Sequence, residues 1–489
     1  MKLKIYQAIA FSMMLGMGTS SCSDWFDVIP RTSVYEEDLY KNEIGYQQVL
    51  TGLYLAMGDD NLYGREASFG LTDVVSGMFY IPKTSNQAYK FAMQYNFEYS
   101  ATKSVATGIW TKAYSVIANA NELLRNAGIR QEIDAENTQN LPLPEAFRSE
   151  QTRNIICGEA LAVRAYLHLD LLRLFGVNPQ VNALKPSIPY VTTLKKDVTR
   201  QYTTSEALQA VITDLLQAEA MLRESDPVVK GNPQPEDNYY KLVNRPVHIN
   251  YYAVCGLLAR AYQYAGKDAE AELWAKKVID SHVFTWTKTA DLNKGDYVGK
   301  SELIFNLFVR DMKDRITPYF RFNNESNNSS QLMPLSETYY RELYTGGDKR
   351  AKGFLSYQGS YLPQKYVVTE DGVADTLSIQ HRIPMVRLSE MYYIASESRL
   401  AANDVTGASG LLNDVRKAKG LKNTDFATAD AVHEEIDNEY SREFVAEGQL
   451  FYYIKRRNLP DRIETQYKVD FVFPLPDNEY TYGNRQPNK

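Results

Sequence analysis

Two short segments contain residue types that could do chemistry, and each lacks something its motif requires. Residues 295–301 resemble a phosphate-binding loop, but only three residues separate the two glycines where four are needed. His433-Glu434 begins a zinc-protease pattern, yet position 437 is Asp, so the second imidazole ligand is absent. With 60 acidic residues, no particular pair of carboxylates stands out as catalytic. The sequence therefore offers no positive case for an enzyme, a metal site or a cofactor.

Aromatic side chains in two loop-rich segments, 58–108 and 284–383, are the remaining candidates for function. The chain has 36 Tyr, 19 Phe and 4 Trp, which together make 12% of its residues. Such rings can stack on the apolar face of a sugar, although many of them could equally pack the loops onto the rest of the protein. Trp286 is the best single candidate, because Trp is scarce and this one lies in a predicted loop. The candidate ligand-binding residues are Tyr80, Tyr95, Trp286, Tyr319 and Asn323.

Length and charge exclude several classes of protein. A chain of 489 residues can bury a large core without disulfides or metals. The 54 basic and 60 acidic residues give a net charge of -6, so no basic excess is available to neutralise a phosphate backbone, and nucleic acid is not an expected partner. Cys157 and Cys255 lie in apolar helical stretches and are expected to be buried.

The N-terminus has the pattern of an export signal. Two lysines precede a mostly apolar run and a group of small residues, so residues 1–21 are expected to be a signal peptide. Cys22 directly follows the small residues, as at a bacterial lipoprotein cleavage site, and we expect it to be lipidated. Thr19 departs from the Leu usual at that site, which leaves ordinary secretory cleavage as the alternative. If Cys22 is lipidated, residues 22–34 would be a tether to a membrane.

Apolar residues at helical spacing predict a mainly α fold over residues 35–489, taken as a single domain. The predicted helical hairpins lie near 37–126, 153–223, 249–281 and 387–419. In the first, Ile44, Val49, Leu53 and Met57 are expected to point inward. In the third, Ala259 and Ala271 flank a turn at Gly266 and match small positions of the tetratricopeptide repeat. About four such hairpins would form a scaffold, with the loops forming an irregular ligand-binding face. A closing helix is expected over 436–454.

Motifs spread along the chain resemble those of the SusD/RagB family of surface nutrient-binding lipoproteins. They are Cys22-Ser-Asp-Trp-Phe-Asp, Trp110-x-x-x-Tyr114-x-x-Ile117-x-x-Ala120-Asn121, Glu159-Ala-Leu-Ala-Val-Arg164, Arg173-Leu-Phe-Gly176, Leu258-Ala-Arg260-Ala-Tyr, Arg387-Leu-Ser-Glu390, Asn413-Asp-Val-Arg416, Glu439-x-x-Arg442-Glu443-Phe444-x-x-Glu447-Gly448 and Phe473-Pro-Leu-Pro476. The resemblance implies four tetratricopeptide-like hairpins and a SusC-like TonB-dependent transporter as partner. These are scaffold motifs, so no ligand-binding residue is transferred from them.

The resemblance implies a lipid-anchored protein of the outer membrane that is displayed at the cell surface. It would bind an oligosaccharide or polysaccharide and deliver it to the transporter without catalysing a reaction. A peptide ligand is the alternative within the family. A surface glycoside hydrolase is the alternative from a different class of protein.

Overall fold

The computed structural model describes residues 39–81, 84–129, 142–194, 197–230, 244–323, 327–367 and 381–489. Helices dominate these residues, which confirms the predicted mainly α class. The longer helices are α3 (Glu43–Met57), α6 (Ser100–Asn126), α7 (Glu150–Phe175), α9 (Thr204–Ser225), α10 (Tyr251–Tyr264), α11 (Asp268–Ile279), α16 (Leu388–Ala401), α17 (Val405–Ala418), α18 (Ala429–Glu443) and α19 (Gln449–Arg457). The shorter ones are α4 (Leu71–Val75), α5 (Gln87–Ala92), α8 (Pro179–Asn182), α12 (Thr289–Asn293), α13 (Met312–Phe320), α14 (Glu337–Leu343) and α20 (Asp477–Thr481).

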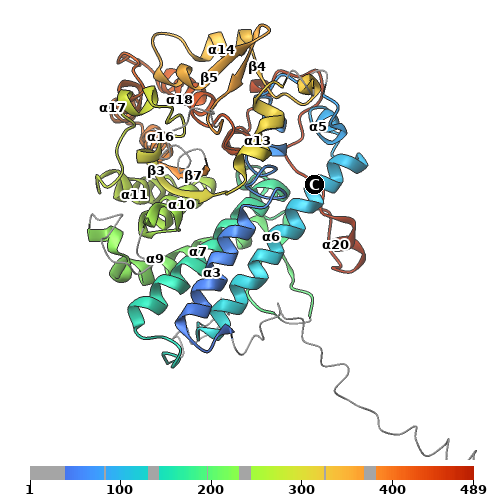
Figure 1. Ribbon diagram of the computed structural model, residues 1–489, viewed down its shortest axis with the longest axis vertical. Helices are drawn as coiled ribbons and strands as arrows, with labels where there is room; N and C mark the ends of the chain where they lie inside the picture. The colour runs from blue at the N-terminus through green and yellow to red at the C-terminus, as the bar shows by residue number, and fades with distance from the viewer. Residues whose placement is uncertain are drawn as a thin grey trace, which may run out of the picture.

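The long helices pack in pairs that follow one another along the molecule (Figure 1). Helix α3 packs on α6, α7 on α9, α10 on α11 and α16 on α17, while α11 also contacts α16 and so joins two successive pairs. Ala259 and Ala271 are fully buried in the third pair, and Gly266 turns the chain between its helices with φ of 70°. Small residues at this contact let the two helices approach closely. The tetratricopeptide-like hairpins are consistent with this packing.

Local capping accounts for where several helices begin. The Thr203 side chain accepts from the backbone N–H of Glu206, whose carboxylate accepts from the backbone N–H of Thr203, which forms a complete capping box at the start of α9. The Ser149 side chain caps α7 in the same position, and α7 ends at Gly176. These caps satisfy backbone donors that have no partner within the first turn.

Three local expectations were wrong. Helix α6 begins at Ser100, so the end of the predicted loop segment 58–108 is helical. The closing helix predicted over 436–454 is two helices, α18 and α19, because the chain turns at Gly448 with φ of 72°, where a Cβ atom would lie 2.7 Å from the Ala67 carbonyl oxygen. Ile44, expected to point inward, is 59% exposed, since the buried face of α3 runs through Tyr46 and Leu50 instead.

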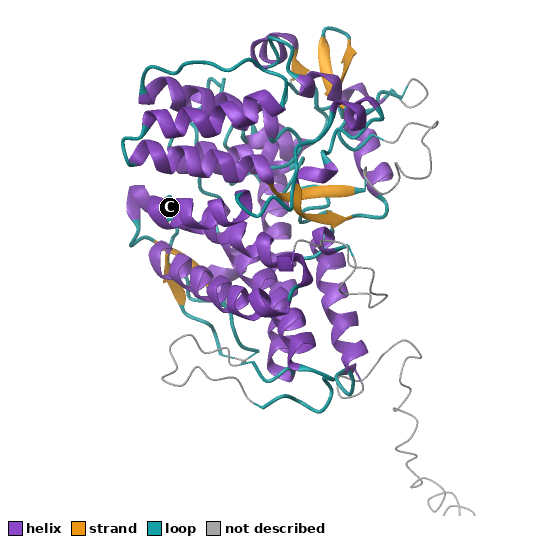
Figure 2. Cartoon of the chain, turned by 90° about the vertical axis from the view of Figure 1, so that its left-hand side faces the viewer, coloured by secondary structure: helices purple, strands orange, loops and turns teal. Residues whose placement is uncertain are grey.

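Strands form only small antiparallel sheets among the described residues (Figure 2). Strand β1 (Pro186–Pro189) pairs with β2 (Gln201–Thr203), and β3 (Leu303–Phe308) pairs with β7 (Arg382–Arg387). A third sheet has the order β4 (Leu335–Ser336), β6 (Ser360–Pro363), β5 (Phe354–Tyr357). Leu335 lies opposite Tyr361 in that sheet, which thereby fixes the start of α14.

Buried ion pairs join helices that are far apart in the sequence. Arg164 on α7 binds both carboxylate oxygens of Asp214 on α9, each at 2.7 Å. Arg260 on α10 makes the same two-pronged contact with Glu390 on α16, again at 2.7 Å. A guanidinium matches a carboxylate in this geometry, so each pair sets the relative position of its two helices. None of the helices in the described part of the chain is long and apolar enough to cross a membrane.

Candidate functional site

A cleft of about 1070 Å³ opens between segments that are distant in the sequence. One side is the loop after α4, the second is α14, the third is formed by α18 and α19, and the turn η7 (Pro460–Arg462) with the residues after it forms the rim. The lining residues are Ser76, Gly77, Met78, Phe79, Tyr80, Ser336, Thr338, Tyr339, Glu342, Leu343, Asp437, Asn438, Ser441, Leu450, Tyr453, Ile454, Asp461, Arg462, Glu464, Thr465 and Gln466. The cleft thus combines aromatic rings with many hydrogen-bonding groups, as sugar recognition requires.

The loop of residues 76–80 presents Tyr80 to solvent. Phe79 is buried and packs against Phe320, with 5.8 Å between the ring centroids, whereas Tyr80 is 56% exposed. The Tyr80 backbone N–H donates to the Pro334 carbonyl at 2.7 Å, which holds the loop against the segment leading to α14. Gly77 allows the rim to close in, because a Cβ atom there would lie 2.8 Å from Cγ2 of Ile463.

Helix α14 is fixed at its start and along its outer face. The Ser336 side chain accepts from the Tyr339 backbone N–H at 3.1 Å and caps the helix. Tyr340 stacks on Tyr361 of β6, with 3.6 Å between the ring centroids. Four residues of this helix line the cleft: Thr338, the half-buried Tyr339, the exposed Glu342 and Leu343.

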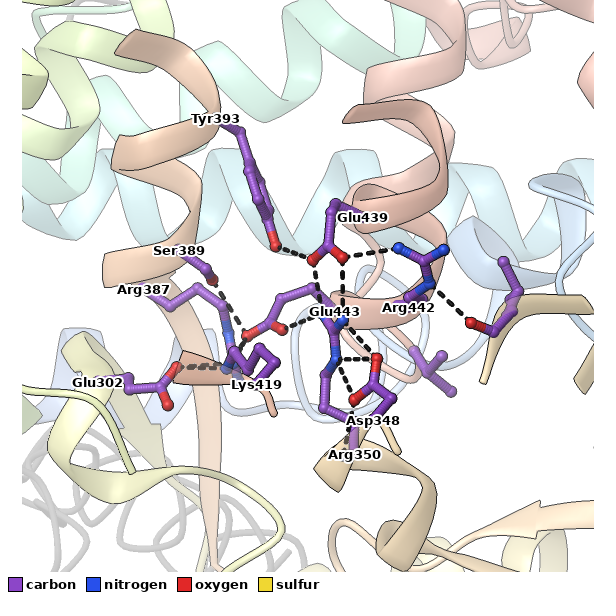
Figure 3. Close-up of polar contacts among 12 residues, drawn as sticks. Glu302, Asp348, Arg350, Arg387, Ser389, Tyr393, Lys419, Glu439, Arg442 and Glu443 are labelled. Carbon is purple, nitrogen blue, oxygen red and sulfur yellow. Dashed lines mark hydrogen bonds and ion pairs between the residues drawn. The ribbon is translucent and has the colours of Figure 1, made fainter. Parts of the chain in front are cut away.

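Helix α18 carries two polar faces with different roles. Asp437, Asn438 and Ser441 line the cleft. Glu439 and Glu443, four residues apart, lie on another face and point into a buried network of charges (Figure 3). Side chains three or four residues apart share one face of a helix, so the spacing separates the two sets.

The buried network contains carboxylates that are held charged. The Arg350 guanidinium donates to Glu439 at 2.8 Å and to Glu443 at 2.9 Å, and the Lys419 ammonium donates to Glu443 at 2.9 Å. Burial by itself would raise the pKa of Glu439, but Arg350 and its hydrogen bonds lower that pKa to about 2. Burial likewise opposes ionisation of Glu443, and Lys419 and Arg387 hold its pKa well below the usual range. Such carboxylates are structural anchors, since a general acid needs a raised pKa.

Arg442 connects this network to the wall of the cleft. Its Nε–H donates to the Leu343 carbonyl at 2.7 Å, at the end of α14, and its Nη1 donates to Glu439 at 2.7 Å. The Tyr344 hydroxyl donates in return to the Arg442 carbonyl at 2.7 Å. The distance between α14 and α18, and so the width of the cleft, is set by buried contacts.

Only Tyr80, among the five candidates from the sequence, lines the cleft. The two loop segments do meet, since Phe69 packs against Tyr319 with ring centroids 6.1 Å apart, and Asn323 is exposed nearby in the chain. Tyr95 is only 8% exposed and its hydroxyl donates to the Val75 carbonyl at 2.8 Å. Its ring packs in the core and has no face available for stacking, which argues against Tyr95 as a platform.

Trp286 lies away from the residues that line the cleft. Its half-buried ring packs against Tyr392 on α16, with 5.1 Å between the centroids, and the Lys419 ammonium lies 5.7 Å from the ring centroid. Trp286 therefore does not line the same cleft as Tyr80. Whether Trp286 binds a ligand of its own stays a prediction.

The sequence interpretation missed most of the cleft wall. Tyr339 and Glu342 come from segment 284–383, which was expected to be loop-rich, and Asp437 comes from the single helix expected over 436–454. Arg462 and Glu464 lie beyond that helix, in residues for which no element was predicted. The available signal was Gly448, which interrupts the helical pattern, followed by the turn sequence Asn458-Leu-Pro-Asp. Cys22, the signal peptide and the tether lie outside the described residues.

Two family models match adjacent parts of the chain. The model described as "Starch-binding associating with outer membrane" matches residues 24–262, and the model described as "SusD family" matches residues 260–485. A curated relative, SusD-like protein P2 of Formosa agariphila, is 22% identical over 204 residues. That match covers 42% of this chain and 36% of the relative, so it spans little more than a third of the relative's length.

Solved structures share the fold over most of the chain. A SusD superfamily protein from Bacteroides thetaiotaomicron has a TM-score of 0.69 at 19% identity, covering 92% of this chain and 100% of that one. Surface glycan-binding protein A from the same organism has a TM-score of 0.66 at 18% identity, with the same two coverages. At these identities the likeness concerns the fold alone.

Proposed function

Because this chain belongs to the SusD/RagB-like family, we propose that it binds a nutrient glycan in the cleft between α14, α18 and residues 76–80. The observation that carries the proposal is an exposed aromatic ring, Tyr80, beside a cleft of about 1070 Å³ with polar walls. A tyrosine ring offers an apolar face for a sugar, and the surrounding amides, hydroxyls and carboxylates can pair with its hydroxyl groups.

Binding without catalysis fits the chemistry of the site. Glu439 and Glu443, whose pKa values are lowered, are buried on a face of α18 that does not line the cleft, and both are paired with cations. The alternative of a peptide ligand draws on the same cleft, because extended peptides also use tyrosine contacts and hydrogen bonds. A glycoside hydrolase, the alternative from a different class of protein, would need two carboxyl groups that flank the glycosidic bond to be cleaved.

The proposal includes attachment and a partner. Lipidation of Cys22 would hold the protein at the outer membrane, and a SusC-like TonB-dependent transporter would receive the glycan. Support comes from the description of the family model that matches residues 24–262, which names association with the outer membrane.

The test of the binding site is Tyr80→Ala. Truncating a stacking ring typically costs about 1–2 kcal/mol, so affinity for a glycan identified on an oligosaccharide array should fall roughly five- to thirtyfold. Tyr482→Ala is the matched control, because Tyr482 is 76% exposed and is not among the cleft residues. Isothermal titration would measure both affinities. Equal affinities for wild type and Tyr80→Ala would contradict the proposed site.

Incubation with the same glycan separates binding from hydrolysis. A binding protein leaves the number of reducing ends unchanged over many hours, whereas a hydrolase increases it. A rise that depends on the purified protein would replace the proposed function with the enzymatic alternative. Binding restricted to peptides on a parallel peptide array would favour the other alternative.

A further inference from the structure

The cleft carries an excess of negative charge. Its ionisable side chains, apart from tyrosines, are Glu342 on α14, Asp437 on α18, and Asp461, Arg462 and Glu464 at the rim. Four of these five groups are carboxylates. The nature of the ligand depends on how many of them are neutralised within the protein.

Arg462, the single arginine that lines the cleft, already binds neighbouring side chains. Its Nη2 donates to Asp437 at 2.8 Å and its Nη1 donates to Asn438 at 3.1 Å. The Tyr453 hydroxyl also donates to Asp437, so this carboxylate is satisfied from two sides. Arg462 and Asp437 therefore form a neutral pair that holds the rim turn on α18, and Arg462 is not free to bind an anionic ligand.

Three carboxylates remain. Glu342, Asp461 and Glu464 are exposed, and no ion pair links any of them to a cation in the described part of the chain. They come from two separate segments and surround the same cavity as Tyr80. Ionised carboxylates in a concave site repel an anionic ligand and attract a cationic one. They also accept strong hydrogen bonds from sugar hydroxyls.

From this charge distribution we infer that Glu342, Asp461 and Glu464 determine the specificity of the cleft, which accepts neutral or amino-bearing glycans and rejects acidic ones. The inference rests on the proposed glycan-binding function and names its substrate class. Tyr80 supplies affinity for any sugar ring, whereas the three carboxylates discriminate by charge.

An array of neutral, amino-bearing and uronate or sulfated oligosaccharides tests the inference, using the full chain at low ionic strength. All bound glycans should be neutral or amino-bearing. Chitosan hexamer and N-acetylchitohexaose share one backbone and differ in charge at mildly acidic pH, where the chitosan amino groups are protonated and side-chain carboxylates remain ionised, so the pair isolates the effect of the amino groups. The expected order is tighter binding of chitosan hexamer, with a difference that shrinks on adding salt.

The matched variants change charge at constant size. In the triple variant Glu342→Gln, Asp461→Asn and Glu464→Gln, affinity for chitosan hexamer should fall roughly five- to tenfold, at up to a few-fold for each exposed charge lost. The control triple variant changes exposed acidic residues outside the cleft, and is Glu224→Gln, Glu270→Gln and Asp425→Asn. Each triple variant loses three negative charges, so a difference in affinity between the two variants must come from where the charges lie.

The outcomes separate this inference from the function on which it rests. Preferred binding of acidic glycans, or equal losses in the two triple variants, would overturn the charge selectivity and leave glycan binding intact. Absence of binding to every glycan class, with binding to an oligolysine peptide, would overturn both. Melting temperatures of the variants establish that each one is folded.

Discussion

At the scale of single residues, His168 shows how burial removes a possible catalytic group. Its ring is fully buried on α7 and stacks on Tyr190, with 3.9 Å between the centroids. Nδ1 lies 2.9 Å from the Arg164 carbonyl, and Nε2 accepts from the Val191 backbone N–H at 3.0 Å. Both contacts require the neutral ring that carries its proton on Nδ1. Burial and then the charge of Arg164 lower the pKa of His168 to about 3.

Because of this histidine, we expect the folded protein to become less stable as pH is lowered. The unfolded chain protonates His168 below pH 6.5, while the folded chain resists protonation down to about pH 3, so stability decreases as pH falls between these values. The loss at pH 5 is about 2 kcal/mol. His168→Gln lacks this titration, so its melting temperature should approach that of wild type as pH falls from 7 to 5. Parallel melting curves over that range would contradict the prediction.

Gly77 is a residue on which the shape of the cleft depends. Gly77→Ala would strain a backbone with φ of 75° and press a methyl group against Ile463, forcing residues 76–80 away from the rim. Gly359→Ala is the matched control, since its φ is also 75° but its nearest atom, on Glu337, is 3.9 Å away. Both changes should cost about 1–2 kcal/mol for the backbone. Only Gly77→Ala should also weaken glycan binding, and equal affinities in a titration would contradict this.

At the scale of elements, α18 joins the scaffold to the candidate site. One face of the helix binds Arg350 and, through Glu443, Lys419 at the end of α17. Another face lines the cleft. A helix held on one side by buried ion pairs can present the other side in a fixed position, which lowers the entropic cost of binding. The charged residues of the motif 439–447 thus support the cleft wall without touching its contents.

Arg442→Met tests this link between α14 and α18. The substitution removes a buried cation from Glu439 and a donor from the Leu343 carbonyl, and breaking such a buried pair costs about 3–5 kcal/mol. Chemical denaturation should show this loss, together with weaker glycan binding in the folded protein. Arg341→Met is the control, because the Arg341–Glu337 pair on α14 is exposed and should matter little. Similar denaturation midpoints for the two variants would refute the structural role of Arg442.

At the scale of the whole molecule, the paired helices form a body that displays α14 and α18 at one end, away from α3, α7 and α9 (Figure 1). Two-pronged ion pairs link α7 to α9 and α10 to α16 within that body. The molecule is therefore organised as a helical scaffold, braced by buried ion pairs, with the candidate binding cleft at one end.

The proposed anchor predicts a change in location. Cys22→Ala, expressed in the native host, should release the protein from the membrane fraction, because the acyl chains on that thiol supply the attachment. Cys255→Ala is the control, since Cys255 is a buried free thiol and its loss should leave the protein in the membrane fraction. Fractionation with mass spectrometry of the N-terminus checks both. A wild-type protein without acyl mass would contradict the proposed anchor.

Much of the helical scaffold could be predicted because helix formation depends on residues that are close together in the sequence. Apolar spacing along α7 and α9, the capping box of Thr203 and Glu206, and the turn at Gly266 involve residues within a few positions of one another. Gly448 marks the break between α18 and α19 in the sequence, but the break was missed because the contact that requires a glycine there is distant, the approach of Gly448 to Ala67. Periodicity carries no record of such an approach.

By itself, the sequence determined the mainly α class, the family resemblance, and an aromatic content suited to sugars. Only the tertiary structure decided which aromatic residues are available: it buries Tyr95, packs Trp286 against Tyr392, and leaves Tyr80 exposed at a cleft. The physical reason is that helices arise from neighbours in the chain, whereas a cleft arises from segments hundreds of residues apart. Burial, ion pairing and charge selectivity all depend on those distant contacts.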